Sequence, residues 1–256
     1  MTRRPTQPRP LQLKTRRLNL ALSSAGLTSR RQADEWIKSG RVIVNGTIVK
    51  EPGFRVILGR DRICVDGKEI PAPPHRLYLM LNKPFGYISS LRDPEGRPVV
   101  TDLMTEIPQR VFSVGRLDFD SMGLLLFTND GEWAYRLTHP SYRVPRTYKA
   151  TVRGRITDQA LEELRRGVRL SDGPSGRATV TLIDRDQRQS QVRATITQGR
   201  PRQVRRMFEA VGYEVIHLTR IGFGTILLGD LKVGHYRHLQ PEEVYEMKKM
   251  VGMAGD

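Results

Sequence analysis

The sequence predicts an α+β protein of two domains, a small N-terminal one and a larger one built on a mostly antiparallel sheet. Strand-like segments outnumber helical ones along the 256 residues, and strands and helices do not alternate regularly. A proline-rich stretch at residues 71–74 is stiff and non-helical, and it separates the two parts. We therefore expect domains at residues 14–72 and 76–250, preceded by a basic, disordered tail at residues 1–13.

The first domain is predicted to begin with two short helices that are followed by small strands. Apolar residues recur at helical spacing within residues 18–22 and again within residues 33–37, and Thr28 or Ser29 can cap the second helix. A hairpin is expected next, because the dipeptide Asn45-Gly46 stands between two short apolar segments.

The second domain is predicted to mix strands and helices irregularly. Strands are expected at residues 77–81, 124–127, 146–152, 177–183, 191–197, 214–219 and 225–228. Helices are expected at residues 132–137, 158–166, 201–210 and 241–250. Thr157 can cap the second of these helices, and Gly167 stands where that helix should stop. The strand at 124–127 is entirely apolar and is expected to be buried.

The composition favours a polyanionic partner and gives no sign of a cofactor. The formal net charge is +16, and residues 1–41 contribute half of it, with ten Lys and Arg against two acidic residues. There is no apolar run of 18 residues and no signal-peptide pattern, so we expect a cytoplasmic protein without membrane contact. Cys64 is the only cysteine, the five histidines lack metal-ligand spacing, and no glycine-rich phosphate loop occurs. We therefore expect neither a metal nor a nucleotide cofactor. A monomer is expected because the sequence presents no long apolar surface helix.

The first domain resembles the alpha-L (S-four-type) RNA-binding domain found in a small-subunit ribosomal protein and in several RNA enzymes. The resemblance rests on Ala-Gly-Leu-Thr-Ser-Arg-Arg-Gln-Ala at residues 25–33 and Ser-Gly-Arg-Val-Ile-Val-Asn-Gly at residues 39–46. It implies that the two helices and the following loop lie on structured RNA. The basic residues that would then contact RNA are Arg17, Arg30, Arg31, Lys38 and Arg41.

Three separated motifs of the second domain carry the candidate chemistry. Asp118 stands in a glycine-bounded turn directly before the apolar strand at 124–127. Tyr148 lies in the middle of a predicted strand between basic residues. Residues 199–206 open a helix with four arginines and no acidic residue. Each alone has an ordinary structural explanation, since a turn aspartate usually bonds its own backbone and a strand tyrosine usually packs in a sheet.

Together these motifs resemble those of the pseudouridine synthases, specifically the RsuA/RluB family that acts on ribosomal RNA. The run Gly-Arg-Leu-Asp-x-x-Ser-x-Gly-Leu-Leu-Leu-x-Thr-Asn-Asp-Gly at residues 115–131 is close to the family signature. By this resemblance Asp118 is the essential aspartate, Tyr148 the active-site tyrosine and Arg205 the basic residue that pairs with the aspartate. Further contacts to the substrate RNA are expected from Arg116, Arg200, Arg202 and Arg206.

The resemblance implies isomerisation of uridine to pseudouridine in ribosomal RNA or a pre-ribosomal particle, with the large-subunit 23S RNA favoured. This reaction needs an ionised carboxylate beside C1′ of the ribose or C6 of the base, but no redox partner. An arginine beside Asp118 would favour its charged form and fix its orientation. Tyr148 could stack on the uracil ring.

Three alternatives stay open at this point. The target could be the small-subunit 16S RNA. The protein could be a non-catalytic RNA-binding or ribosome-assembly protein, whose mark would be loss of Asp118, Tyr148 or Arg205. A nucleoside or glycoside hydrolase would need a second carboxylate, for which Asp120 or Asp130 could be proposed.

Overall fold

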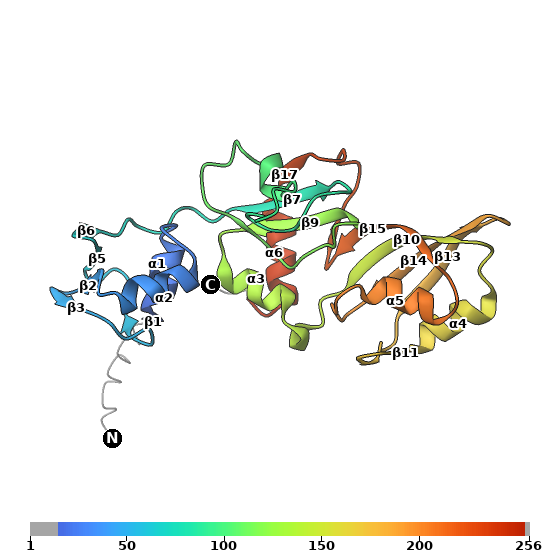
Figure 1. The fold of residues 1–256 in the computed structure, drawn as a ribbon, viewed down its shortest axis with the longest axis horizontal. Coiled ribbons are helices and arrows are strands. Elements are labelled where there is room, and N and C mark those ends of the chain that lie inside the picture. Colours follow the sequence, from blue (N-terminus) through green and yellow to red (C-terminus); the bar gives the residue numbers. More distant parts are fainter. Residues whose placement is uncertain (1–14, 254–256) are drawn as a thin grey trace, which may run out of the picture. The chain divides into compact units, whose positions relative to one another are not determined.

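A computed structural model describes residues 15–253 of the protein in two compact units (Figure 1). The first unit is Met1–His75 and the second is Arg76–Asp256. The tail predicted at residues 1–13 lies outside the described residues. Within the described part, no helix is long and apolar enough to cross a membrane.

The first unit consists of two helices and small antiparallel sheets. Its elements are β1 (Arg16–Arg17), α1 (Leu18–Ser24), α2 (Arg30–Lys38), β2 (Val42–Val44), β3 (Thr47–Ile48), β4 (Arg55–Val56), β5 (Ile63–Val65) and β6 (Lys68–Glu69). Ser29 caps α2 by accepting a hydrogen bond from Gln32 N at 3.1 Å. The predicted hairpin is confirmed, because Asn45 and Gly46 both take positive φ angles between the paired strands β2 and β3.

The core of the first unit lies between its helices and its four-stranded sheet, ordered β3-β2-β5-β6. Leu18 and Leu22 of α1 and Ile37 of α2 are fully buried there against Val42 of β2 and Val56 of β4. The apolar spacing noted in the sequence therefore faces this core, and the charged residues of α2 remain outside.

The second unit is an α+β domain around one nine-stranded, mostly antiparallel sheet, as predicted. Its strands are β7 (Tyr78–Lys83), β8 (Phe112–Ser113), β9 (Met122–Thr128), β10 (Arg146–Arg153), β13 (Thr179–Arg185), β14 (Gln189–Ile196), β15 (Val215–Phe223), β16 (Ile226–Leu227) and β17 (Tyr236–His238). The main order is β13-β14-β10-β15-β9-β7-β17, and the pair β9 and β15 is parallel. Two short strands, β11 (Arg169–Leu170) and β12 (Gly173–Pro174), form a separate hairpin.

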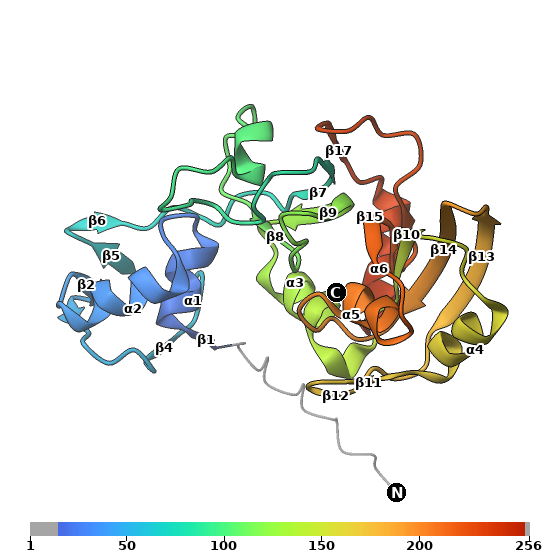
Figure 2. The same ribbon diagram turned by 45° about the vertical axis from the view of Figure 1, so that its right-hand side comes forward.

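Helices cover this sheet in two groups (Figures 1 and 2). The helices are α3 (Gly131–Thr138), α4 (Asp158–Arg166), α5 (Gln203–Ala210) and α6 (Pro241–Met250), and the short 3-10 turns are η1 (Val100–Leu103) and η2 (Pro140–Tyr142). Apolar residues of α4 and α5 pack on one face of β10, β13 and β14, whereas α3 and α6 pack on β7 and β9.

Strand β9 is buried on both faces, which explains its uninterrupted apolar run. Leu124 and Leu126 face α3 and α6, whereas Leu125 and Phe127 face the core around Met104. All four strand residues are fully buried, which confirms the prediction for residues 124–127.

Glycine at position 123 permits the close approach of β9 to β15. Gly123 has φ +98°, and a Cβ atom there would collide with the backbone of Arg220. The start of β9 therefore lies directly against β15 at Thr219 and Arg220, next to the turn that carries Asp118.

Candidate active site

The backbone of the turn that carries Asp118 is held in place by a buried lysine. Lys83, the last residue of β7, is fully buried, and its Nζ donates hydrogen bonds to the carbonyl oxygens of Asp118 at 3.1 Å, Ser121 at 2.7 Å and Pro84 at 3.1 Å. On the other side, Ser89 Oγ donates to Leu117 O at 2.7 Å. These bonds fix the backbone of the turn, so the direction of the Asp118 side chain is set by the scaffold.

Burial lowers the pKa of Lys83 to about 8. Removal from water disfavours the ammonium form, and the nearby carboxylates of Asp118 and Asp120 oppose this effect by favouring it. The three carbonyl oxygens around Nζ satisfy the three donors of an ammonium group. Lys83 therefore stands in the turn as a cation held by backbone dipoles at neutral pH.

A cavity of about 440 Å³ opens beside this turn. Asp118 lines it together with Arg116 and Ser121 from the turn, Tyr148 from β10 and Arg220 from β15. The remaining lining residues are Val114, Gly115, Leu117, Thr138, Arg146, Ile196, Gly199, Arg200, Pro201, Arg202, Gln203, Val204 and Leu218. The volume suits a small ligand such as a nucleoside. The Asp118 carboxylate makes no hydrogen bond or ion pair with other described residues.

Tyr148 and Arg220 are neighbours across the sheet at the wall of this cavity. They are register partners of β10 and β15, next to a bulge between Thr147 and Tyr148. Arg220 in turn is the register partner of Gly123 on β9. The structure thus brings Asp118 and Tyr148 to one cavity, as the sequence predicted, and adds an arginine that the sequence analysis missed.

Arg220 is a buried cation with unused hydrogen-bonding capacity. Its side chain is 2% exposed, Nε donates to Leu124 O at 2.7 Å, and Nη2 has no partner among the described residues. Its guanidinium lies 5.1 Å from the ring centre of Phe223, and that of Arg146 lies 5.2 Å from the same ring. Burial lowers the pKa of Arg146, and repulsion from Arg220 adds to this. Two arginines therefore supply positive potential to the cavity.

In the structure Arg205 pairs with Asp120, and no ion pair between Arg205 and Asp118 occurs among the described residues. Arg205 Nη2 donates to Asp120 O at 2.8 Å, and its Nε lies 3.2 Å from Asp120 Oδ2. Nη1 donates to Val215 O at 2.7 Å. These three contacts hold the guanidinium against Asp120 and Val215, and Arg205 is not among the residues that line the cavity.

Asp120 joins α5 to the turn of Asp118. Besides Arg205, it binds Arg202 Nη1 at 3.0 Å through Oδ2. Arg202 lies immediately before α5 in the left-handed region at φ +50°, which is strained for a residue with a side chain. Asp120 is therefore an ion-pair centre and is occupied by two arginines. Asp130, the other carboxylate considered for a hydrolase, caps α3 and accepts a bond from Tyr78 Oη at 3.0 Å.

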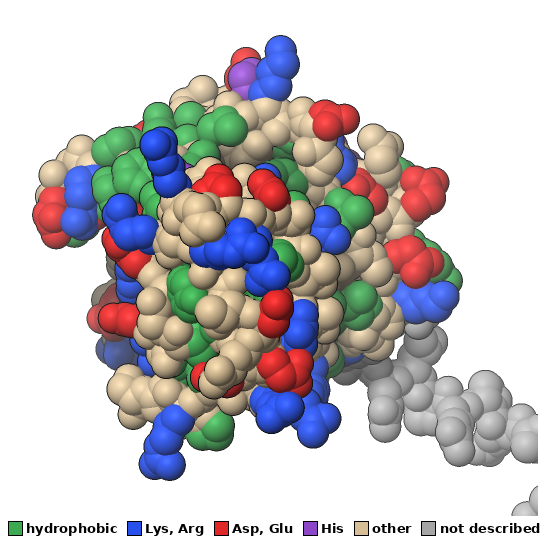
Figure 3. Space-filling view, turned by 90° about the vertical axis from the view of Figure 1, so that its right-hand side faces the viewer, with side chains coloured by type: hydrophobic (Ala, Val, Ile, Leu, Met, Phe, Trp, Pro, Cys, Tyr) green, Lys and Arg blue, Asp and Glu red, His purple; other side chains and the backbone are tan. Residues whose placement is uncertain are grey.

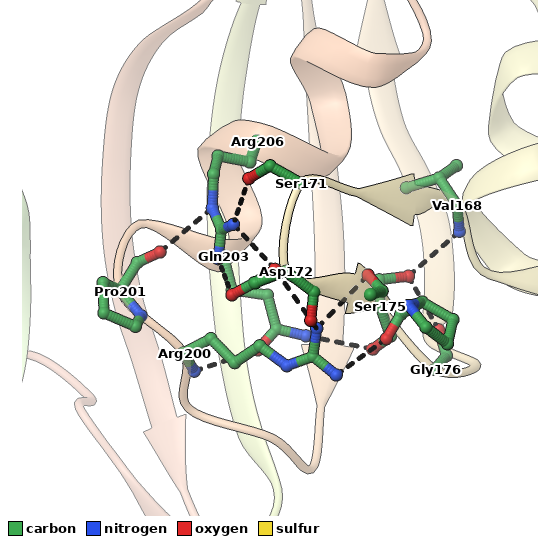
Figure 4. Close-up of polar contacts among 11 residues, drawn as sticks. Val168, Ser171, Asp172, Ser175, Gly176, Arg200, Pro201, Gln203 and Arg206 are labelled. Atoms are coloured by element: carbon green, nitrogen blue, oxygen red, sulfur yellow. Dashed lines mark hydrogen bonds and ion pairs between the residues drawn. The ribbon is translucent and has the colours of Figure 1, made fainter.

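Arg200 and Arg206 are held in a second cluster, which Figure 4 shows. Arg206 binds both oxygens of Asp172, at 2.8 and 3.0 Å, and Arg200 Nη1 lies 3.2 Å from Oδ1. These bonds lower the pKa of Asp172 to about 2. Gln203 Nε2 adds a bond to Ser175 O at 3.0 Å. The cluster fixes the β11–β12 hairpin to the start of α5, and Arg200 keeps its place in the cavity wall.

The predicted RNA-contact residues of the first unit differ in how far their charges are already paired. Arg17, Arg30 and Arg31 are exposed and form no ion pair with other described residues. Lys38 pairs with Glu35 at 3.2 Å. Arg41 donates from Nε to Asp66 at 2.9 Å and lies 4.8 Å from the ring centre of Trp36. Arg116 in the second unit is exposed at the cavity.

Among residues 15–253, no group of three or more His, Cys, Asp or Glu side chains could hold a metal ion. The donors that surround the cavity are instead arginines, hydroxyls and a single carboxylate. This arrangement suits an anionic, base-bearing ligand approached by one carboxylate.

Comparison with known proteins identifies both units. Residues 77–210 match the family described as RNA pseudouridylate synthase, and residues 16–61 match the S4 domain. The ribosomal large subunit pseudouridine synthase B of Bacillus subtilis (strain 168) is 44% identical over 236 residues, which are 91% of this chain and 96% of that protein. An uncharacterized RNA pseudouridine synthase of Aquifex aeolicus (strain VF5) is 40% identical over 93% of this chain and 95% of its own length. A crystal structure of a pseudouridylate synthase matches with a TM-score of 0.65 and 30% identity, covering 90% of this chain and 99% of that chain.

Proposed function

The chain belongs to the RNA pseudouridylate synthase family, and on this premise we propose that it isomerises uridine in ribosomal RNA with Asp118 as its reactive group. The observation that carries the proposal is the position of Asp118, on a rigid turn at a nucleoside-sized cavity, with no described partner for its carboxylate. Its neighbours Asp120 and Asp130 are occupied by arginines and by a helix N-terminus, respectively.

The reaction breaks the bond between N1 of uracil and C1′ of the ribose, turns the base and joins C5 to C1′. The proton on C5 is then lost and N1 gains a proton, so the atoms balance without a redox partner. The carboxylate of Asp118 supplies the negative charge that bond cleavage needs, at C1′ or at C6. Tyr148 packs on the uracil ring from the β10 side of the cavity.

Arg220 takes the role that the sequence analysis gave to Arg205. It lines the cavity with Asp118, is fully enclosed, and has a free Nη2 among the described residues. A buried guanidinium of this kind favours the ionised carboxylate and repays part of its own desolvation by pairing with it. Arg205 acts indirectly, because it holds Asp120 and hence the far end of the same turn.

We infer the large-subunit 23S RNA as the target because the Bacillus subtilis relative, which is similar over nearly its whole length, is named a ribosomal large subunit pseudouridine synthase. The S4-type unit then anchors the enzyme on structured rRNA through Arg17, Arg30 and Arg31. Because the proposed substrate is ribosomal RNA, we propose that the enzyme works in the cytoplasm, as a monomer.

Asp118→Asn should abolish pseudouridine formation and leave RNA affinity within about threefold, because the change removes the reactive charge but keeps the side-chain shape. The measurement is tritium release from 5-tritiated uridine in 23S and in 16S rRNA, with filter binding of the same RNAs. Asp130→Asn is unsuitable as a control because Asp130 caps α3, so the control is Asp184→Asn on the exposed part of β13.

The outcomes separate the competing functions. Undiminished release by Asp118→Asn would exclude Asp118 as the reactive group. Binding without release by the wild type from either RNA would favour a binding or assembly protein. Release from 16S but not 23S rRNA would move the target to the small subunit.

A further inference from the structure

Two phenylalanine rings lie exposed beside the turn of Asp118. Phe85 is 59% exposed and Phe119 is 47% exposed, although both are large apolar side chains. Their ring centres are 5.9 Å apart with an interplanar angle of 57°. Exposed apolar area of this kind is unfavourable in water and, when contiguous, usually marks a contact surface.

The backbone connects both rings to the proposed active site. Phe119 directly follows Asp118, and Phe85 directly follows Pro84. The carbonyl groups of Asp118 and Pro84 both accept hydrogen bonds from Lys83 Nζ, at 3.1 Å each. A further bond joins Gly86 N to Phe119 O at 3.0 Å. The two aromatic residues therefore belong to the same fixed scaffold as Asp118.

A flipped uridine leaves its neighbouring bases without a stacking partner. Extruding a base costs a few kcal/mol, and aromatic side chains stack on any base with a typical gain of about 1–3 kcal/mol. An aromatic surface next to the reactive carboxylate lies where a neighbouring base must pass when the target uridine enters the cavity. Arg116, exposed in the same turn, can meet the connecting phosphate.

We propose that Phe85 and Phe119 form a stacking surface for the unpaired base next to the flipped uridine of the substrate RNA. This inference rests on the proposed function, and it assigns to the two rings a role in holding the extruded conformation. The occupant is a nucleobase rather than a protein surface, because Phe119 directly follows Asp118, whose cavity is lined by Arg116, Arg146 and Arg220 and therefore carries positive charge that suits RNA.

The test is a double-mutant cycle between the rings and the neighbouring base. Tritium release by the wild type first locates the target uridine in rRNA fragments. RNA fragments with that uridine are then made intact, or with an abasic nucleotide on either side of it. Dissociation constants are measured with Asp118→Asn protein, which leaves the RNA unreacted, and with the same protein carrying Phe85→Ala and Phe119→Ala.

For one of the two sides, we expect the abasic replacement to weaken binding by about five- to 100-fold when the rings are present. The alanine substitutions should weaken binding of the intact RNA by a similar factor. The two changes together should weaken it no further than either alone, because both remove the same contact. Tyr245→Ala, which truncates an exposed aromatic residue of α6, should leave the abasic effect unchanged.

The inference would be overturned if, on both sides of the uridine, the alanine substitutions and the abasic replacement reduced RNA affinity by independent factors that multiply. A Phe85→Leu and Phe119→Leu variant that binds the intact RNA as tightly as the protein with both rings, and loses as much affinity on abasic replacement, would also overturn it. Leucine keeps the apolar bulk but has no stacking face. A dimer that the alanine substitutions dissociate, without coupling to the RNA, would assign the rings to a contact between copies. The failure of the proposed function is a separate result, namely no tritium release by the wild type from any rRNA.

Discussion

Arg220 is the residue whose placement most needs a chemical reason. A guanidinium that is 2% exposed with a free nitrogen costs several kcal/mol unless another charge compensates it. Strand register sets it beside Tyr148, and the close approach at Gly123 sets it against the start of β9. In the proposed function, the Asp118 carboxylate and the substrate RNA provide this compensation at the cavity that Arg220 and Asp118 both line.

Arg220→Met should lower kcat for pseudouridine formation by about 100-fold or more, because it removes the fixed positive charge beside the carboxylate. RNA affinity should change less than about fivefold. Arg220→Lys should recover part of the rate, since it restores the charge but not the fork of donors. Single-turnover tritium release and filter binding measure these effects, and circular dichroism confirms folding.

Arg205→Met is the matched variant for this comparison. It removes an arginine of the same neighbourhood that binds Asp120 and lies outside the cavity lining. We expect a smaller loss of rate together with a lower melting temperature. Equal or larger loss of kcat in Arg205→Met, with unchanged stability, would restore the original assignment of Arg205.

Sequence reasoning brought Asp118 and Tyr148 to the cavity but overlooked Arg220, which also lines it, for a physical reason. Arg205 stands in a conspicuous basic run, whereas Arg220 is a single charge in a mostly apolar strand. The run contains no acidic residue, so its charges look unpaired in the sequence. In the structure they pair with Asp120 and Asp172, which are distant along the chain. The more informative pattern was a single charged residue in an apolar strand. A lone cation with Leu218 and Gly222 on the same strand face is expensive to bury and must have a role.

At the scale of elements, the end of β7 determines the geometry of the reactive turn. Lys83 links the end of this strand to both ends of the turn that leads into β9, through the carbonyls of Asp118 and Ser121. Because β7 and β9 pair antiparallel from Tyr78 to Lys83, the lysine also stays in register with Gly123. The turn is therefore an extension of the sheet, and motions of the surrounding loops need not displace it.

The unusual ionisation of Lys83 predicts a specific dependence of stability on pH. Its pKa is about 8 when folded and 10.5 when unfolded, so the unfolded chain binds more protons between these values. The free energy of unfolding of the wild type should therefore rise, relative to Lys83→Met, as the pH increases from 8 to 10.5. The rise should approach about 3 kcal/mol, with a constant difference below pH 8.

Urea unfolding of both proteins at pH 7 and pH 10 measures this difference. Groups other than Lys83 titrate similarly in the two proteins and cancel in the comparison. A difference that stays constant between these pH values would show that the lysine keeps an ordinary pKa in the folded state.

Long elements were predictable and short ones were not. The helices at 158–166 and 241–250 were located to the residue, because Thr157 caps one and Pro241 opens the other. By contrast, β11 and β12 have two residues each, too few for any periodicity. They are held by the ion pairs of Asp172. Strand β15 extends past its predicted end at residue 219 to Phe223, which is how Arg220 came to be overlooked.

The protein has a net charge of +16, but many of its basic side chains are already paired with acidic ones and only the unpaired ones are free to contact phosphate. Figure 3 shows basic and acidic side chains interspersed on the end of the molecule that carries β13, β14 and α4. There, Arg185 pairs with Asp158 and Arg166 pairs with Glu162. Charges that are already paired release few counterions on binding, so the affinity should depend on unpaired groups.

Replacing Arg17, Arg30 and Arg31 together by Gln should reduce the dependence of log Kd on log salt concentration by about two units, as expected for the loss of three phosphate contacts. Replacing Lys38 and Arg41 by Gln should change the slope less, because Glu35 and Asp66 already pair with them. Filter binding to rRNA between 50 and 300 mM KCl, roughly the range where such slopes are linear, provides the measurement. An unchanged slope in the triple variant would exclude the S4-type unit as the electrostatic anchor.

The parallel pairing of β9 with β15 also sets the order in which parts of the molecule can form during synthesis. Asp118 precedes β9, whereas Arg220 follows about a hundred residues later on the neighbouring strand. Such a distant pairing forms slowly and cannot form before the chain as far as Arg220 has left the ribosome. A nascent chain can therefore complete its S4-type unit early, whereas the cavity can be assembled only after Arg220 has emerged.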